Sequence, residues 1–92
     1  MQTVVVGAGE VGFDVARILA LEQHDVTVID IEEDVLHNVQ NTLDVMTVHG
    51  NGTSAQVLEE AGIRGADLLV AVTAVDEVNL IACMMADRLG VE

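Results

Sequence analysis

A chain of 92 residues is long enough for one domain, and with 51% hydrophobic residues it is not a disordered protein. Its 16 acidic residues against 3 basic ones, all arginine, give a net charge of -13, which argues against nucleic acid as a partner because phosphates would be repelled. Such a charge is typical of an acidic cytosolic protein or, with lysine missing altogether, of adaptation to high salt. The apolar runs are too short for direct membrane insertion. A single cysteine and no visible secretion signal predict a cytoplasmic location.

The beginning of the chain predicts a strand followed by a helix. The apolar run at Thr3–Val6 predicts a strand over about 2–6, and apolar residues at helical spacing predict a helix over about 10–21. The residues expected on the buried face of this helix are Val11, Val15, Ile18 and Leu19.

A glycine-rich stretch joins this strand to this helix. It consists of Gly7, Ala8, Gly9, Glu10, Val11 and Gly12. Between a strand and a helix, GxGxxG is the fingerprint of dinucleotide binding. Gly7 permits a tight turn, Gly9 lets a pyrophosphate approach the backbone, and Gly12 lets the helix pack closely. The helix N-terminus offers the phosphates unpaired N–H groups. The alternative is a tight turn without a ligand, although such a turn needs only one glycine.

Val26–Ile29 predict a second strand, which ends at Asp30. The fingerprint expects an acidic residue about 20 residues after the glycines, where it accepts hydrogen bonds from the adenosine ribose. A carboxylate at Asp30 would repel the 2′-phosphate of NADP. The alternative role for Asp30 is a helix N-cap. The acidic run after Ile31 most simply complements the N-terminus of a helix predicted over about 32–40.

A loop rich in small residues follows the third predicted strand, which covers about 44–48. In this loop Asn51 lies between two glycines, a pattern that allows left-handed backbone geometry. Thr53 or Ser54 can cap a third helix over about 55–61, which Gly62 ends. The loop is either a simple turn or, as we favour, a segment beside the adenine of a nucleotide, with Asn51, Gly52 and Thr53 as its contact residues.

The last predicted strand covers about 67–72 and reads as a buried parallel strand that ends at Thr73. Thr73 either contacts a ribose or phosphate, or caps the turn. The final helix, over about 76–89, is apolar on more than one face. Its expected sheet-facing stripe is Val78, Ile81, Ala82, Met85 and Leu89, whereas Leu80, Cys83 and Met84 lie largely outside it. These apolar residues outside the stripe, together with an open strand edge beside the helix, predict a homo-oligomer.

The order of these elements predicts an α/β fold. We expect a Rossmann-like doubly wound parallel sheet with strand order 3-2-1-4, truncated after the fourth helix, with residues 1–92 forming one domain. Since the chain ends where a fifth strand would begin, we expect a fragment of a longer protein.

Nothing in the sequence predicts catalysis. No histidine follows the last strand as a proton donor or acceptor, and no tyrosine is present for a reductase-like pair. Cys83 lies among apolar helix residues and reads as core or interface packing. The three histidines have no metal-ligand spacing. The alternative function is the cofactor-binding domain of an NAD-dependent dehydrogenase, which would need a separate substrate domain.

The whole chain resembles the N-terminal nucleotide-binding domain of the TrkA/KTN/RCK family of potassium-transport regulators. The first two matching stretches, which any dehydrogenase could share, are 5–12 (VVGAGEVG) and 28–30 (VID). The more specific ones are 50–53 (GNGT), 58–62 (LEEAG), 66–73 (ADLLVAVT) and 76–79 (DEVN).

The resemblance implies a cytoplasmic regulatory domain that binds NAD(H), ATP, ADP or AMP. It places the glycine loop on the phosphates, Asp30 and the adjoining Ile31 at the ribose, Asn51 and Gly52 near the base, and Thr73 near the sugar or phosphates. It further implies a ring of such domains that gates a potassium transporter or channel subunit in the membrane.

The charge balance predicts a fold that salt stabilises well beyond a typical mesophilic domain. At about 1 M salt the Debye length falls to about 3 Å, so repulsion among the carboxylates is suppressed. The melting temperature should therefore rise between about 0.1 M and about 2 M KCl. An unchanged melting temperature over this range would refute the interpretation.

Overall fold

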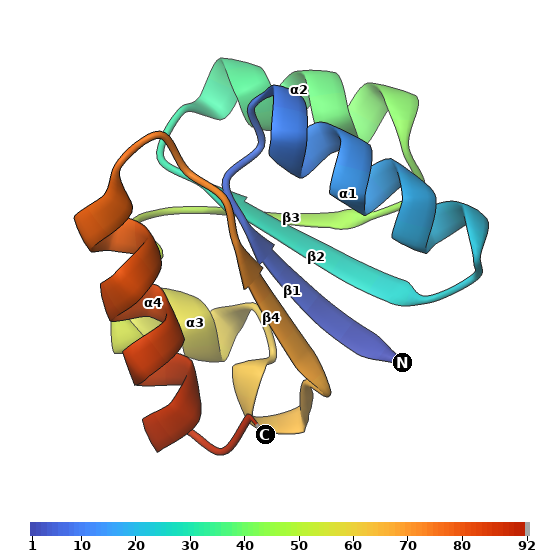
Figure 1. Ribbon diagram of the computed structural model, residues 1–92. Helices are drawn as coiled ribbons and strands as arrows, with labels where there is room; N and C mark the ends of the chain where they lie inside the picture. The colour runs from blue at the N-terminus through green and yellow to red at the C-terminus, as the bar shows by residue number, and fades with distance from the viewer. Residues whose placement is uncertain (92) are drawn as a thin grey trace.

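The computed structural model describes residues 1–91 and contains a four-stranded sheet with helices on both faces (Figure 1). In chain order the elements are β1 (Gln2–Val6), α1 (Glu10–Leu21), β2 (Asp25–Asp30), α2 (Glu33–Thr42), β3 (Met46–His49), α3 (Ala55–Glu60), the 3-10 helix η1 (Ile63–Gly65), β4 (Leu68–Ala71) and α4 (Asp76–Arg88). Their types and order confirm the sequence prediction. The short helix η1 was not predicted; it follows Gly62, whose φ of 84° turns the chain out of α3.

The strands are all parallel and follow the spatial order β3-β2-β1-β4, as predicted. In the centre of the sheet, Val5 lies opposite Val28 of β2 and Val70 of β4. The helices α1 and α2 cover one face, while α3 and α4 cover the other (Figure 1). The carboxyl ends of all strands, and the turns that follow them, therefore meet at one edge of the sheet.

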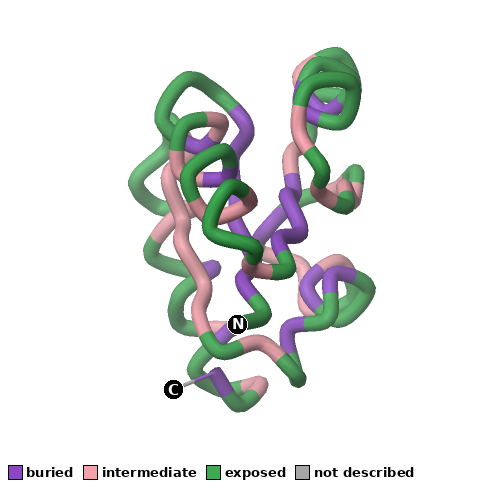
Figure 2. Tube along the Cα trace, turned by 90° about the vertical axis from the view of Figure 1, so that its right-hand side faces the viewer, coloured by how far each residue is buried: buried purple, intermediate pink, exposed green. Residues whose placement is uncertain are grey.

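Two aliphatic clusters form the core, one on each face of the sheet. Residue alternation along β1 sends Val5 toward α1 and α2, and its neighbours Val4 and Val6 toward α3 and α4. Figure 2 shows the buried stretches inside and the exposed ones along the outer turns of the helices. The two central strands are almost wholly buried, which explains their continuous apolar sequences.

The last strand is less buried than predicted. All four residues of β4 are only partly buried. The reason is its position, since β4 forms the edge of the sheet and has a strand neighbour on one side only. Leu69 and Ala71 pack toward the α3–α4 side.

The helix α1 is rotated relative to its predicted orientation. Val15 and Leu19 pack inward as expected, but Val11 and Ile18 are 59% and 49% exposed. The fully buried positions are instead Gly12 and Ala16. Small side chains let a helix approach the sheet closely, so α1 presents the line of its smallest residues rather than its longest apolar stripe.

The helix α4 packs in the same manner through Ala82 and Ala86. Met85 and Leu89 flank this line and are partly buried, but Ile81, predicted to face the sheet, is 43% exposed. Cys83 is exposed, so of its two predicted roles core packing in this chain is excluded, and interface packing stays a prediction.

Among the described residues, no helix has the length and apolarity that crossing a membrane requires.

Candidate functional site

A crevice of about 340 Å³ lies at the carboxyl ends of the strands. The glycine-rich turn after β1, the segment after β2, the loop after β3 and the turn after β4 all contribute to it. Its lining residues are Val6, Gly7, Gly9, Ile29, Asp30, Ile31, Glu32, Val35, Gly50, Asn51, Gly52, Val72, Thr73, Ala74, Val75 and Val78. The walls are therefore mainly apolar, with a few polar groups placed among them, as in many small-molecule sites.

The glycines of the first turn have different surroundings. Gly7 has a φ of 108°, and a Cβ added to it would lie 3.0 Å from the backbone nitrogen of Thr73. A Cβ on Gly12 would lie only 1.8 Å from the carbonyl oxygen of Gly7. A Cβ on Gly9 would meet nothing within 4 Å. Gly7 and Gly12 are therefore required by packing, whereas Gly9 leaves open space where the turn meets the crevice.

The N-terminus of α1 is not capped by a side chain. Gly9 is its N-cap and supplies no hydrogen-bonding side chain to the first-turn N–H groups. These groups have no partner within a helix, and together with the helix dipole they favour an anion. Glu10, in this first turn, is exposed.

Asp30 joins the glycine-rich turn to the segment after β2. Its Oδ2 accepts a hydrogen bond from the backbone N–H of Ala8 at 2.8 Å, and its Oδ1 accepts one from Glu32 at 2.8 Å. The N-cap position of α2 belongs to Glu32, so the alternative of Asp30 as that cap was wrong. A carboxylate has about four lone-pair sites, so each oxygen of Asp30 can still accept from a ligand hydroxyl.

The loop after β3 has its glycines for a different reason than predicted. Neither Gly50 nor Gly52 has a positive φ. A Cβ on Gly50 would lie 2.6 Å from Cγ2 of Val57, and one on Gly52 would lie 2.3 Å from Cγ1 of Val6. Close packing of the loop on the core therefore requires both glycines.

Side chains within the same loop fix its shape. Asn51 Oδ1 accepts hydrogen bonds from the N–H of Thr53 at 2.9 Å and from its hydroxyl at 2.8 Å. Of the two predicted caps of α3, Ser54 is the one that acts, since its Oγ accepts from the N–H of Val57.

Thr73 is held by a side chain that sequence reasoning did not single out as a site residue. Its N–H and its hydroxyl donate to Oδ1 of Asn79 at 2.8 and 2.7 Å, and its carbonyl accepts from Nδ2 of Asn79 at 3.0 Å. The hydroxyl also accepts from the N–H of Val75 at 3.2 Å. Thr73 thus organises the turn after β4 while lining the crevice.

The structure brings most of the predicted site residues to one crevice. Those that line it are Gly7, Gly9, Asp30, Ile31, Asn51, Gly52 and Thr73; those that do not are Ala8, Glu10, Val11, Gly12 and Thr53. Ala8, Gly12 and Thr53 support the lining residues through the contacts described above. The apolar residues Val35, Val75 and Val78 also line the crevice and were not predicted to. Val78 was predicted only to pack on the sheet.

No arginine or lysine lines the crevice among the described residues. Arg17 lies near Asp14, and Arg64 forms an ion pair with Glu59. Any anion in the crevice would therefore depend on backbone N–H groups and the α1 dipole for its binding.

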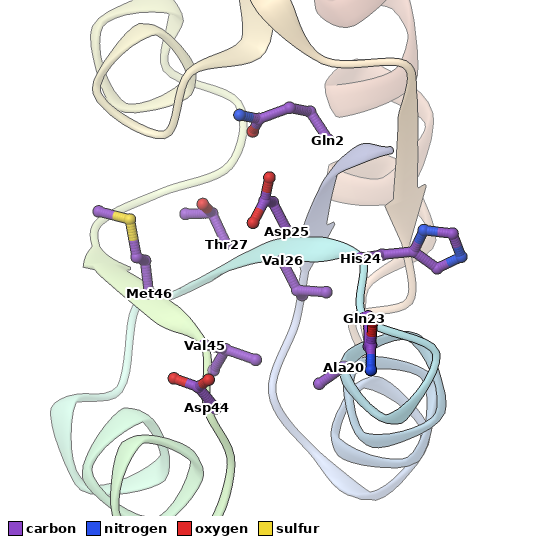
Figure 3. Close-up of a pocket in the computed structure, with 10 residues that line it drawn as sticks. All are labelled: Gln2, Ala20, Gln23, His24, Asp25, Val26, Thr27, Asp44, Val45 and Met46. Carbon is purple, nitrogen blue, oxygen red and sulfur yellow. The ribbon is translucent and has the colours of Figure 1, made fainter.

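A larger hollow, of about 570 Å³, lies at the opposite edge of the sheet (Figure 3). It is formed at the amino ends of β1, β2 and β3, and Gln2, His24, Asp25, Asp44 and Met46 are among the residues that line it. Ligands of open α/β sheets bind at the carboxyl ends of the strands, and none of the predicted site residues lies here. The smaller crevice is therefore the candidate site.

Comparison with known families matches residues 3–92 to the TrkA-N domain. The chain is 46% identical over 89 residues to the Trk system potassium uptake protein TrkA of Halomonas elongata, covering 97% of this chain and 20% of that protein. It is 51% identical over 86 residues to TrkA homolog 2 of Methanosarcina mazei, covering 94% of this chain and 18% of that protein. The chain thus spans about a fifth of the length of these curated relatives.

Solved structures share the fold at low sequence identity. Shewanella denitrificans Kef CTD in its AMP-bound form has a TM-score of 0.81 and 21% identity, over 96% of this chain and 52% of that one. The NAD(P)-binding domain of an exopolyphosphatase-related protein from Archaeoglobus fulgidus has a TM-score of 0.82 and 16% identity, over 96% of this chain and 65% of that one. The fold is therefore Rossmann-like.

The contrast between Gly12 and Gly9 predicts opposite outcomes for one substitution. Gly12→Ala forces a methyl group into the Gly7 carbonyl and should destabilise the fold by about 2 kcal/mol or more. Gly9→Ala meets open space at a φ of -69° and should leave the unfolding free energy within about 1 kcal/mol. Chemical denaturation of both variants measures this. Equal destabilisation by the two variants would contradict the packing assignment.

Proposed function

Because the chain belongs to the TrkA-N domain family, we propose that it is the cytoplasmic nucleotide-binding domain of a regulator of potassium uptake. In this role it binds NAD(H) or another adenine nucleotide in the crevice at the carboxyl ends of the strands. The observation that carries the proposal is the uncapped N-terminus of α1, which opens beside Gly9 where no atom lies near the missing side chain. Both features suit an approaching phosphate.

The crevice has complementary groups for each part of such a ligand. The α1 N-terminus takes the phosphates, Asp30 at the end of β2 takes the ribose hydroxyls, and the apolar walls near Ile31 and Val35 take the adenine, with Asn51 beside it. A solved structure of the same fold, Kef CTD, is described in an AMP-bound form, which supports an adenine nucleotide here.

The charge distribution favours a nucleotide without a 2′-phosphate. Asp30 and Glu32 both line the crevice at the ribose end, and no arginine or lysine among the described lining residues offsets them. A 2′-phosphate at this position would face carboxylates only. We therefore assign the site to NAD(H), ATP, ADP or AMP rather than NADP.

The proposed role is binding and regulation, not catalysis. The described lining residues include carboxylates at Asp30 and Glu32, but no histidine, cysteine, lysine or tyrosine that could exchange a proton with a substrate during hydride transfer to or from a nicotinamide. The curated relatives are named as potassium uptake proteins, which supports the same conclusion. In such a system, nucleotide occupancy alters a regulator that gates a potassium transporter or channel subunit in the membrane.

A surface on α4 suits assembly with a second copy. Leu80 and Met84 lie one helical turn apart and are 63% and 60% exposed, with Ile81 and Cys83 exposed beside them. The neighbouring strand β4 is the open edge of the sheet. Leaving this apolar area in water costs about 25 cal/mol per Å², so covering it by another protomer is favourable. The proposed regulator is accordingly a homo-oligomer.

The assignment of the ribose to Asp30 predicts a change in nucleotide selectivity. Asp30→Ala should weaken NAD binding by roughly 1.5–3 kcal/mol, the range for hydrogen bonds to a charged group. Asp30→Asn should also lose affinity for NAD but should accept NADP better, because it keeps one acceptor oxygen and removes the charge. Titration calorimetry with NAD and NADP measures both effects.

Glu32→Gln is the matched control for this experiment. It removes one negative charge from the same crevice wall, yet Glu32 is assigned no ribose contact, so NAD affinity should change by less than about twofold. Tighter binding of NADP than of NAD by the unmodified chain would defeat the assignment.

The assembly surface predicts a change in mass in solution. The unmodified chain should form a dimer or larger species by light scattering, and Leu80→Glu with Met84→Glu should shift it toward monomer, because two charges would be buried in the contact. Leu21→Glu on α1, where Leu21 is 72% exposed, is the control and should assemble normally. An unmodified chain that stays monomeric at high concentration contradicts the proposal.

A further inference from the structure

Asn79 closes a ring of hydrogen bonds with Thr73, and the two residues are here called the Thr73–Asn79 clasp. The carboxamide of Asn79 satisfies both main-chain groups of Thr73, accepting from its N–H at 2.8 Å and donating to its carbonyl at 3.0 Å. It also accepts from the Thr73 hydroxyl at 2.7 Å. The clasp therefore provides hydrogen-bond partners for the N–H and the carbonyl of Thr73, as a neighbouring strand does for a residue inside a sheet.

The clasp fixes one wall of the candidate site. The turn between β4 and α4 contributes four lining residues, Val72, Thr73, Ala74 and Val75, and the first turn of α4 adds Val78. Asn79 ties this turn to the first turn of α4. Asn79 itself does not line the crevice. Its effect on a ligand would therefore be exerted through Thr73.

The clasp also abuts the glycine-rich turn. A Cβ on Gly7 would lie 3.0 Å from the nitrogen of Thr73 and 3.1 Å from the carbonyl oxygen of Val72. Gly7 in turn lies against Gly12 of α1, whose Cβ would lie 1.8 Å from the Gly7 oxygen. The turn after β4, the proposed phosphate-binding turn and the start of α1 are thus in backbone contact, and the Asn79 side chain ties the first turn of α4 to them.

We infer that Asn79 is a positioning residue for nucleotide binding, which holds the Thr73 backbone against Gly7 and couples the occupied crevice to the N-terminus of α4. The inference rests on the proposed function. Because coupling between two sites is reciprocal, a nucleotide that favours the closed clasp must also stabilise the first turn of α4. The exposed apolar face of α4 begins within this region, at Leu80.

The first test measures NAD and AMP affinity by calorimetry. Asn79→Ala should bind about tenfold more weakly than the unmodified chain, as expected for the loss of more than one hydrogen bond. Asn38→Ala is the matched control, since Asn38 is an exposed asparagine in the helix α2, and it should bind within about twofold of the unmodified chain. Circular dichroism confirms that each variant is folded.

A double-mutant cycle separates positioning from direct contact. If the Thr73 hydroxyl acts through the clasp, Thr73→Val should weaken binding in the unmodified chain and add less than about twofold to Asn79→Ala. If the hydroxyl binds the nucleotide directly, Thr73→Val should cause the same loss in both backgrounds, and the inference is wrong. Should Asn79→Ala fail to fold, Asn79→Asp replaces it in the cycle, because it keeps the acceptor oxygen but cannot donate to the Thr73 carbonyl.

Hydrogen exchange provides a readout that a merely structural residue would not change. Saturating NAD should slow amide exchange at Thr73 and in the first turn of α4, and Asn79→Ala should abolish this nucleotide-dependent protection. If the unmodified chain binds neither NAD nor AMP, the proposed function and the inference both fail. If it binds and Asn79→Ala binds equally well, only the inference fails.

Discussion

The backbone of Gly7 touches three other segments of the chain, and the candidate site depends on these contacts. Its N–H donates to the carbonyl of Ile29 in β2 at 2.8 Å. Its carbonyl lies against Gly12 of α1, and its Cα faces the backbone of Thr73 after β4. A side chain at either glycine would separate these segments. The arrangement therefore brings β1, β2, α1 and the β4–α4 turn together at one point, where the crevice forms.

Asp30 has a comparable role on the other side of the crevice. Its carboxylate is bound by the N–H groups of Ala8 and Glu32, so it orders the glycine-rich turn and the start of α2 before any ligand is present. A chain of net charge -13 thus binds anions, in the function we propose, with oriented backbone groups instead of basic side chains. Because these groups are already fixed by packing, binding would require little further ordering.

The helices α1 and α4 follow one packing rule. Each approaches the sheet through two small residues one turn apart, Gly12 and Ala16 in α1 and Ala82 and Ala86 in α4. Close approach through small residues fills the space next to the valine-rich strands without aromatic side chains, which make up only 1% of the chain. It also leaves larger apolar residues on the outer faces of both helices, and those of α4 form the proposed assembly surface.

The sequence alone determined the order of the elements, the strand order and the position of the glycine-rich turn, because hydrophobic periodicity and glycine spacing are local signals. Gly9, Asp30, Asn51 and Thr73 were also expected around one nucleotide, since each lies at or after the carboxyl end of a parallel strand. Only the tertiary structure decided which face of α1 is buried, why Gly50 and Gly52 are glycines, and that Asn79 binds Thr73. These features depend on distances between atoms of segments that pack together only after the chain has folded, and no periodicity in the sequence encodes such distances.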